Sequence, residues 1–158
     1  MRAVAYGIRP FEKEFLAKAN QKKHDITLIS NDLNWDTASY AEGKEAVIVS
    51  INDDVSEAVI ETLAGFGIKF IATRSMRTDH INKAAASKYG IKIANVPGYL
   101  LPAEAEHTVV LTDDALQQIA NQTIRSLDLW QQGKCTGKAC VCADGCKADD
   151  LNNKQQLL

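Results

Sequence analysis

The sequence predicts an α/β protein built on a doubly wound parallel sheet. Short apolar runs alternate with segments of helical periodicity, and glycine or proline stands at several junctions between them. Apolar residues make up 46% of the 158 residues, which is enough for one hydrophobic core. Alternation of this kind is typical of β/α units whose strands lie parallel, with right-handed crossovers that place helices on both faces.

Five short apolar segments are the expected strands. The third contains the continuous run Ala46-Val47-Ile48-Val49, which is typical of a central strand covered on both faces. The first apolar run ends at Gly7, and Pro97-Gly98 interrupts the chain after the fifth. In chain order, we expect the strands at 3–6, 25–30, 45–51, 68–72 and 91–94.

Capping residues and apolar periodicity predict the helices between the strands. Pro10 is placed to begin the first helix, since proline costs no hydrogen bond in a first turn. Ser56 and Thr112 are the expected N-caps of two others, and Gly133 follows the last one. In chain order, we expect helices from 10, at 36–41, from 57, at 79–89 and at 113–132.

Five such units suit a flavodoxin-like five-stranded sheet of order 2-1-3-4-5, with the last helix covering the fifth strand. After Lys134 the apolar period stops, and cysteine, glycine, asparagine, glutamine and lysine dominate. We therefore expect one flavodoxin-like domain over 1–133 and a flexible, cysteine-containing tail over 134–158.

Charge and hydropathy argue against several classes of partner. The net charge is −2 and the sequence pI about 5.9, so no basic surface for nucleic acid or anionic lipid is expected. No apolar run approaches the roughly 20 residues of a membrane span, and the N-terminus has no signal-peptide core. A cytoplasmic location is expected.

All four cysteines lie close together, with the spacing C-x4-C-x-C-x3-C. Disulfide bonds among them therefore cannot cross-link the rest of the fold. They are Cys135, Cys140, Cys142 and Cys146. Four thiolates could bind zinc or another soft metal, but the paired C-x2-C knuckles of a zinc site are missing. We expect no metal; the alternative of a metal-binding module stays open beside that of a flexible tail with reduced thiols.

A set of motifs in a fixed order carries a family resemblance. Residues 67–75 read Gly-Ile-Lys-Phe-Ile-Ala-Thr-Arg-Ser, followed by Asp-His-Ile-Asn at 79–82 and Asn-Val-Pro-Gly-Tyr at 95–99. A second stretch begins His-Thr-Val-Val-Leu-Thr-Asp-Asp at 107 and continues to Gly133. Together they resemble the D-2-hydroxyacid dehydrogenases, and the D-lactate dehydrogenase branch in particular.

The resemblance implies a substrate-binding domain made of two segments, 1–106 and 107–133. The family places a complete NAD-binding domain between them, whereas here they abut. Independently of the family, a dinucleotide site needs a glycine-rich turn from a strand into a helix. No G-x-G-x-x-G occurs, and the nearest match, Gly65-Phe66-Gly67, precedes a strand. No cofactor-binding residues are therefore expected, although the parent family uses NAD.

The resemblance also implies roles for four residues. Backbone N–H groups of Met76 and Arg77 would hold the carboxylate of a 2-oxoacid, and the Tyr99 hydroxyl would assist. His107 matches the family's general acid/base, whose orienting carboxylate and carbonyl-polarising arginine belong to the absent domain; we expect it to be vestigial. Arg77 departs from the family's usual glycine, which permits positive φ. The alternatives are a solvated loop side chain for Arg77, a half-buried aromatic for Tyr99 and a partly exposed histidine for His107.

The leading functional hypothesis is an isolated, truncated or engineered substrate-binding domain that binds a 2-oxoacid or 2-hydroxyacid weakly and is not catalytic alone. One alternative is a part of an active NAD-dependent D-lactate dehydrogenase, once a nucleotide domain is supplied. Another is a small flavodoxin-like binding module. A monomer is expected, with self-association through the uncovered surface near 99–110 as the alternative.

Overall fold

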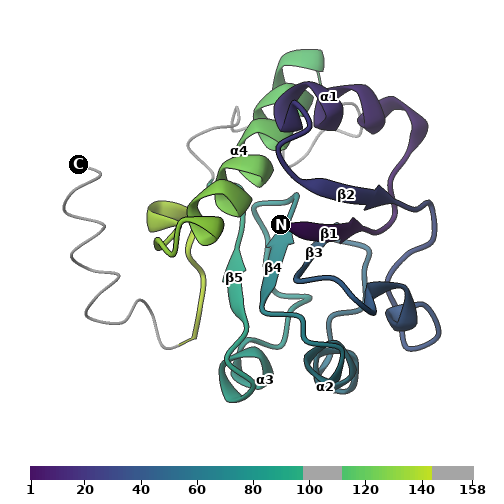
Figure 1. Cartoon of the computed structure of the whole chain (residues 1–158), viewed down its shortest axis with the longest axis vertical. Coiled ribbons are helices and arrows are strands. Elements are labelled where there is room, and N and C mark those ends of the chain that lie inside the picture. Colours follow the sequence, from purple (N-terminus) through teal and green to yellow (C-terminus); the bar gives the residue numbers. More distant parts are fainter. Residues whose placement is uncertain (98–111, 144–158) are drawn as a thin grey trace.

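A single parallel sheet lies at the centre of the molecule. The computed structural model describes residues 1–97 and 112–143. Five strands pair in the order β2-β1-β3-β4-β5, which confirms the predicted class, strand number and order (Figure 1). The strands are β1 (Arg2–Ala5), β2 (Asp25–Leu28), β3 (Ala46–Val49), β4 (Phe70–Thr73) and β5 (Lys92–Ala94).

Branched apolar residues lie side by side across the sheet. Val4 is in register with Val47, Val47 with Ile71, and Ile71 with Ile93. All four side chains are buried. β-branched residues pack well on a pleated surface, so this row forms the centre of one core layer.

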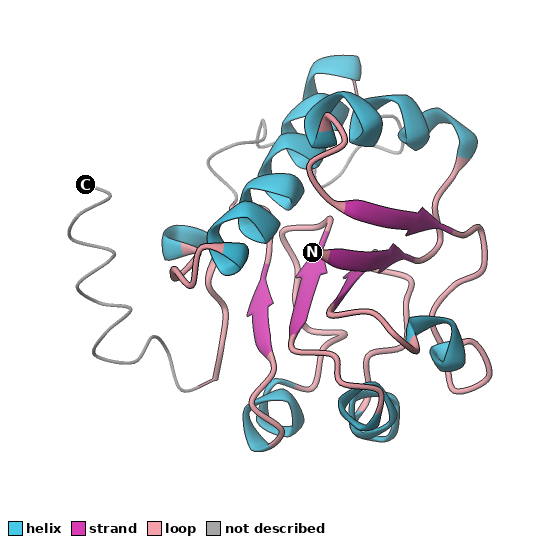
Figure 2. Ribbon diagram, viewed as in Figure 1, coloured by secondary structure: helices cyan, strands magenta, loops and turns pink. Residues whose placement is uncertain are grey.

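Helices cover both faces of the sheet, as predicted (Figure 2). On the face that packs against α1 and α4, most buried strand residues are alanines, which allows helix and strand backbones to approach closely. On the other face the strand residues are mainly valine and isoleucine, and they pack against α2 and α3. The helices are α1 (Pro10–Asn20), α2 (Glu57–Gly65), α3 (Lys83–Lys88) and α4 (Asp113–Gln131), with a 3-10 turn η1 (Ala38–Ala41) on the α2 side.

Helix α4 closes the α1 face of the sheet. Its predicted N-cap is confirmed, because the Thr112 hydroxyl accepts a hydrogen bond from a backbone N–H of the first turn at 3.1 Å. Near its other end Trp130 stacks on Phe70 of β4, with 4.8 Å between ring centroids. His24 Nε2 and Asp128 Oδ1, 2.7 Å apart, join α4 to the α1–β2 turn. No described helix, α4 included, is long and apolar enough to cross a membrane.

Helix α3 is shorter than the predicted 79–89. Asn82 is its N-cap and accepts a hydrogen bond from a backbone N–H at 2.9 Å. The residues before it form a loop that pairs with the entrance to α2: Ile81 bridges Val55, and Asn82 N donates to Val55 O at 3.0 Å. This tertiary pairing takes the backbone groups that a longer helix would use.

Residues 134–143 differ from the flexible tail expected from 134 onward. They form a 3-10 turn, η4 (Gly137–Ala139), and run along the outer edge of β5 (Figure 1). Asn95 N donates to Ala139 O at 2.9 Å, and Val141 N donates to Ile93 O at 3.1 Å. Backbone N–H and C=O groups at a sheet edge lack hydrogen-bond partners within the sheet. This segment supplies such partners to β5. Residues 144–158, the rest of the expected tail, lie outside the described residues.

Candidate functional site

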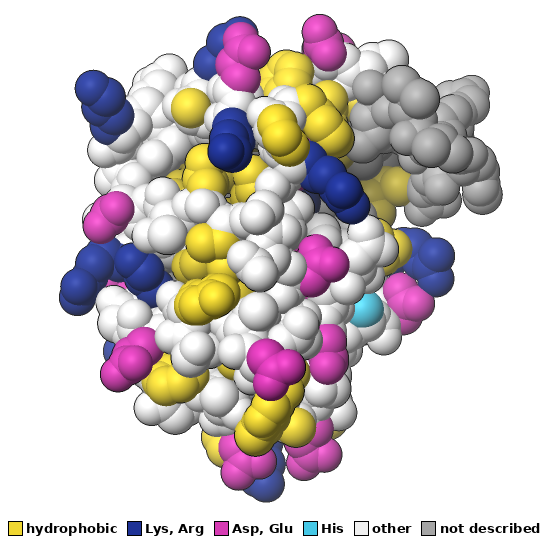
Figure 3. Space-filling view, turned by 90° about the vertical axis from the view of Figure 1, so that its right-hand side faces the viewer, with side chains coloured by type: hydrophobic (Ala, Val, Ile, Leu, Met, Phe, Trp, Pro, Cys, Tyr) yellow, Lys and Arg dark blue, Asp and Glu magenta, His cyan; other side chains and the backbone are white. Residues whose placement is uncertain are grey.

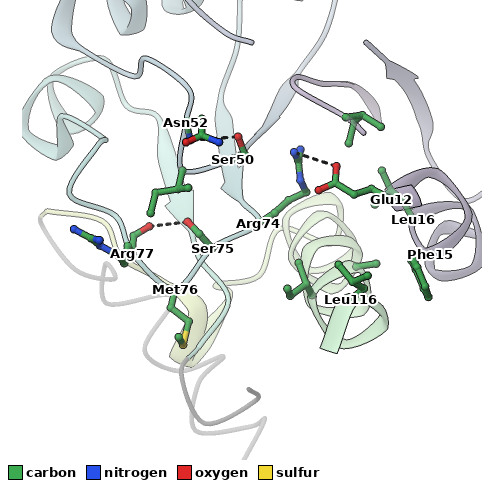
Figure 4. Close-up of a pocket in the computed structure, with 14 residues that line it drawn as sticks. Glu12, Phe15, Leu16, Ser50, Asn52, Arg74, Ser75, Met76, Arg77 and Leu116 are labelled. Carbon is green, nitrogen blue, oxygen red and sulfur yellow. Dashed lines mark hydrogen bonds and ion pairs between the residues drawn. The ribbon is translucent and has the colours of Figure 1, made fainter. Parts of the chain in front are cut away.

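A cavity of about 320 Å³ opens at the carboxyl edge of the sheet, between α1 and α4 (Figure 4). In open α/β sheets, ligands bind at this edge, where consecutive connections pass to opposite faces. Figure 3 looks onto the side toward which β1 and β2 run, and groups of hydrophobic side chains are exposed there. The cavity wall is mainly apolar, and its polar members come from the loops after β3 and β4 and from α1: Ser50, Asn52, Arg74, Ser75, Arg77 and Glu12.

The turn after β1 requires glycine. Gly7 has φ +60°, in the left-handed region, and its N–H donates to Asn31 O at 2.7 Å. A Cβ at this position would lie 2.7 Å from Asp32 Oδ1. The missing side chain therefore lets the loop after β2 approach the point where β1 leads into α1.

Arg74 ties the end of β4 to the end of β1. Its side chain is 8% exposed, Nη1 donates to Tyr6 O at 3.0 Å, and Nη2 donates to Gly7 O at 3.4 Å. Nη2 is also 3.6 Å from a carboxylate oxygen of Glu12. Burial lowers the pKa of Arg74, and the nearby carboxylates of Glu12 and Asp53 oppose that shift. The guanidinium thus stays charged in the cavity wall.

Asp53 organises the loops beside Arg74. It is 3% exposed, and it accepts hydrogen bonds from Leu33 N at 2.7 Å and from Ser50 N at 2.6 Å. Burial raises the pKa of Asp53, while these two bonds and the charge of Arg74 act in the opposite direction. Neither Arg74 nor Asp53 is among the predicted site residues. A charged residue directly after a buried strand is the sequence signal that could have identified Arg74, which follows the last residue of β4.

The loop predicted to hold a carboxylate borders the cavity, and Met76 and Arg77 both line it. Asn95 Nδ2 donates to Met76 O at 2.8 Å, and this hydrogen bond holds the backbone of the loop in place. Within the described chain, neither the Met76 N–H nor the Arg77 N–H has a hydrogen-bond acceptor. These two donors thus lie beside the cavity without an acceptor from the described residues.

Arg77 fits this loop without the backbone freedom of glycine. Among described non-glycine residues, positive φ occurs at Gln21 and Lys22 and not at Arg77. The Arg77 side chain is 63% exposed and pairs with Asp79, with Nη2 2.9 Å from Oδ2, so it points away from the cavity (Figure 4). The hydrogen bond from Arg77 lowers the pKa of Asp79.

Tyr99 and His107, and with them the surface near 99–110, lie outside the described residues. Over 1–97 and 112–143, no group of three or more histidine, cysteine or acidic side chains is arranged to hold a metal ion.

The comparisons with known proteins point to one family. The model of the D-isomer specific 2-hydroxyacid dehydrogenase catalytic domain matches residues 3–140. D-lactate dehydrogenase of Escherichia coli (strain K12) is 33% identical over 110 residues, which are 69% of this chain and 33% of that protein.

Solved structures agree. The apo-structure of Escherichia coli D-lactate dehydrogenase has a TM-score of 0.61 at 31% identity, covering 62% of this chain and 31% of that chain. D-lactate dehydrogenase with NAD+ from Lactobacillus jensenii has a TM-score of 0.55 at 27% identity, covering 63% and 31%. The chain therefore spans about a third of the length of its relatives. It belongs to the D-isomer specific 2-hydroxyacid dehydrogenase family, through that family's catalytic domain.

Proposed function

We propose that this chain is a substrate-binding domain that holds the carboxylate of a 2-oxoacid or 2-hydroxyacid and does not turn it over alone. The observation that carries this proposal is the pair of N–H groups of Met76 and Arg77 beside the cavity, which have no acceptor in the described chain. Hydrogen bonds from backbone N–H groups to a carboxylate are charge-assisted and therefore stronger than those to a neutral acceptor.

The surroundings of the loop suit the rest of such a ligand. Arg74 adds a positive charge to the wall, while Leu16, Leu116 and Ile119 give an apolar surface on the α1 and α4 side. A small acid with an apolar substituent would place its charge at the loop and its substituent against the helices. We expect weak binding, because the rest of the family's active site belongs to a separate domain.

Reduction of a 2-oxoacid also needs a hydride donor. The 158 residues contain no G-x-G-x-x-G turn, and all five described strands belong to the substrate-binding sheet. In this proposal His107 is vestigial, since a general acid contributes little without a positioned donor and substrate carbonyl.

Amide-resolved NMR with pyruvate, and with its unreactive analogue oxamate, tests the binding site. We expect the largest shifts at the Met76 and Arg77 amides. Arg77→Ala keeps the backbone N–H and should retain binding, whereas Met76→Pro removes one donor and should weaken it. Loss of binding in Arg77→Ala alone would assign recognition to the side chain instead.

A kinetic test addresses turnover. With NADH and pyruvate we expect no decrease in nicotinamide absorbance, and calorimetry should show no saturable heat for NADH. Robust turnover by the purified chain would contradict the proposal.

A second candidate is a half-enzyme that becomes active with a separate nucleotide domain. The catalytic-domain match over 3–140, in a chain that spans about a third of its relatives, favours it. Mixing with the isolated NAD-binding domain of a related dehydrogenase should then restore NADH-dependent pyruvate reduction. No activity in the mixture, with each domain folded, would count against it.

A further inference from the structure

Two cysteines lie together on the segment that covers the edge of β5. Cys140 and Cys142 are present as thiols, are partly exposed, and hydrogen-bond to each other. Neither lines the cavity at the carboxyl edge. The pair therefore forms a second chemically distinct feature of the molecule.

The backbone holds the two sulfur atoms on one side. Cys140 forms an antiparallel bridge with Ala94, and its φ of −68° and ψ of 123° are extended. In an extended segment, residues two apart point to the same side. Val141 N donates to Ile93 O at 3.1 Å, and Ile93 N donates to Cys142 Sγ at 3.3 Å. The arrangement is thus set by the sheet edge before any ligand arrives.

This geometry suits a bridging metal ion better than a disulfide. Residues two apart in an extended strand have Cα atoms about 6.6 Å apart, near the upper end of the range for disulfides. A metal ion with metal–sulfur bonds of about 2.3 Å spans a wider gap between the sulfurs. The two thiols lie within hydrogen-bonding contact, so binding requires little rearrangement.

The number of thiols narrows the choice of metal. Cys135 is disulfide-bonded, so its sulfur cannot serve as a thiolate ligand. A four-thiolate zinc site would require it, because these are the only four cysteines in the chain. Thiolates select soft ions, of which Cu(I) is satisfied by two sulfur ligands.

We propose that Cys140 and Cys142 form a two-thiolate site for Cu(I). Each thiol gives up its proton and each sulfur forms one bond to the ion, so two protons are released and nothing is oxidised or reduced. The Ile93 N–H and the positive charge of Lys92 favour the thiolate of Cys142. The hydrogen bond with Cys140 and burial raise the pKa of Cys142, so affinity should increase with pH.

Anaerobic titration with Cu(I), in competition with bicinchoninate, measures the site directly. The wild-type chain should bind one Cu(I). Cys140→Ser and Cys142→Ser should each weaken binding by about a hundredfold or more, since loss of a ligand exceeds the effect of losing an outer-shell partner. Serine is close in size to cysteine and its hydroxyl can accept the Ile93 N–H, so circular dichroism should be unchanged.

Cys135→Ser is the matched control and should leave Cu(I) affinity unchanged. If it weakens binding as much as Cys142→Ser, the site includes Cys135 and the two-thiolate proposal is overturned. The proposal also fails if the Cys140→Ser/Cys142→Ser double variant binds Cu(I) as tightly as wild type.

Discussion

Replacing Arg74 with methionine should lower the free energy of unfolding by about 3 kcal/mol. The side chain is 8% exposed, so solvent does not screen its contacts strongly. Methionine fills most of the aliphatic volume but loses the hydrogen bonds to Tyr6 O and Gly7 O. Two bonds from a charged donor, at about 1.5 kcal/mol each, give that magnitude. It lies at the lower end of the roughly 3–5 kcal/mol for breaking a buried charge pair.

Urea unfolding at neutral pH measures the change. Arg77→Met is the matched control: the same substitution in the same loop, on a side chain 63% exposed and in a surface ion pair. We expect it to change stability by no more than about 0.5 kcal/mol. A loss below about 1 kcal/mol in Arg74→Met, with the control unchanged, would refute the idea that this guanidinium holds the strand ends together.

A double-mutant cycle separates the contribution of the Glu12 carboxylate, which lies 3.6 Å from Arg74 Nη2. Glu12→Gln removes its charge but keeps an oxygen that can accept the Arg9 N–H, which Glu12 Oε2 accepts at 3.0 Å in the native chain. We expect the two substitutions to be less than additive, with an interaction of about 0.5–3 kcal/mol. Strict additivity would show that Arg74 acts through the backbone carbonyls alone.

Three further predictions use the same unfolding assay. Gly7→Ala should cost about 1–3 kcal/mol, because φ is +60°; an unchanged midpoint would contradict this. Trp130→Ala should lower the free energy of unfolding by about 3–5 kcal/mol, through the lost stack on Phe70 and the cavity left behind. A loss no larger than that from replacing an exposed tryptophan with alanine would contradict this. Burial raises the pKa of Asp128, but hydrogen bonds from Lys23 and His24 outweigh burial and lower it. The stabilisation that the Asp128 carboxylate gives the fold is therefore fully present above the unfolded pKa of about 3.9. It is lost as the pH falls through the lower pKa of the folded state. In Asp128→Asn, the free energy of unfolding should therefore fall less steeply at acid pH than in the wild type. The same acid dependence in both proteins would refute this role of Asp128.

The parallel sheet was predictable because its signals are local. Continuous apolar runs such as Ala46-Val47-Ile48-Val49 identify buried strands, and alternation with helices leaves few topologies. The helix N-cap at Thr112 was predictable in the same way, because its side chain forms a hydrogen bond within the first turn of its own helix.

What the sequence could not predict depends on partners distant along the chain. The residues at the start of α3 pair with Val55, a contact that no local pattern predicts. Residues 134–143 carry no apolar period that predicts a helix or a strand, yet their backbone groups pair with the edge of β5. The role of Arg74 likewise comes from carbonyl groups of β1 and the turn after it.

Helix α4 completes the core on one face of the sheet. It supplies Ile124, Leu127 and Trp130 to the core on the alanine-rich face of the sheet, where strand side chains alone are too small to form a core. With α1 beside it, the described residues cover both faces of the sheet without any contribution from a nucleotide-binding domain. The Met76–Arg77 loop is held by two side chains of the same domain: Asn95 Nδ2 donates to Met76 O, and Ser75 Oγ donates to Arg77 O. The loop that we propose to bind a carboxylate is therefore held in place by residues of this domain itself.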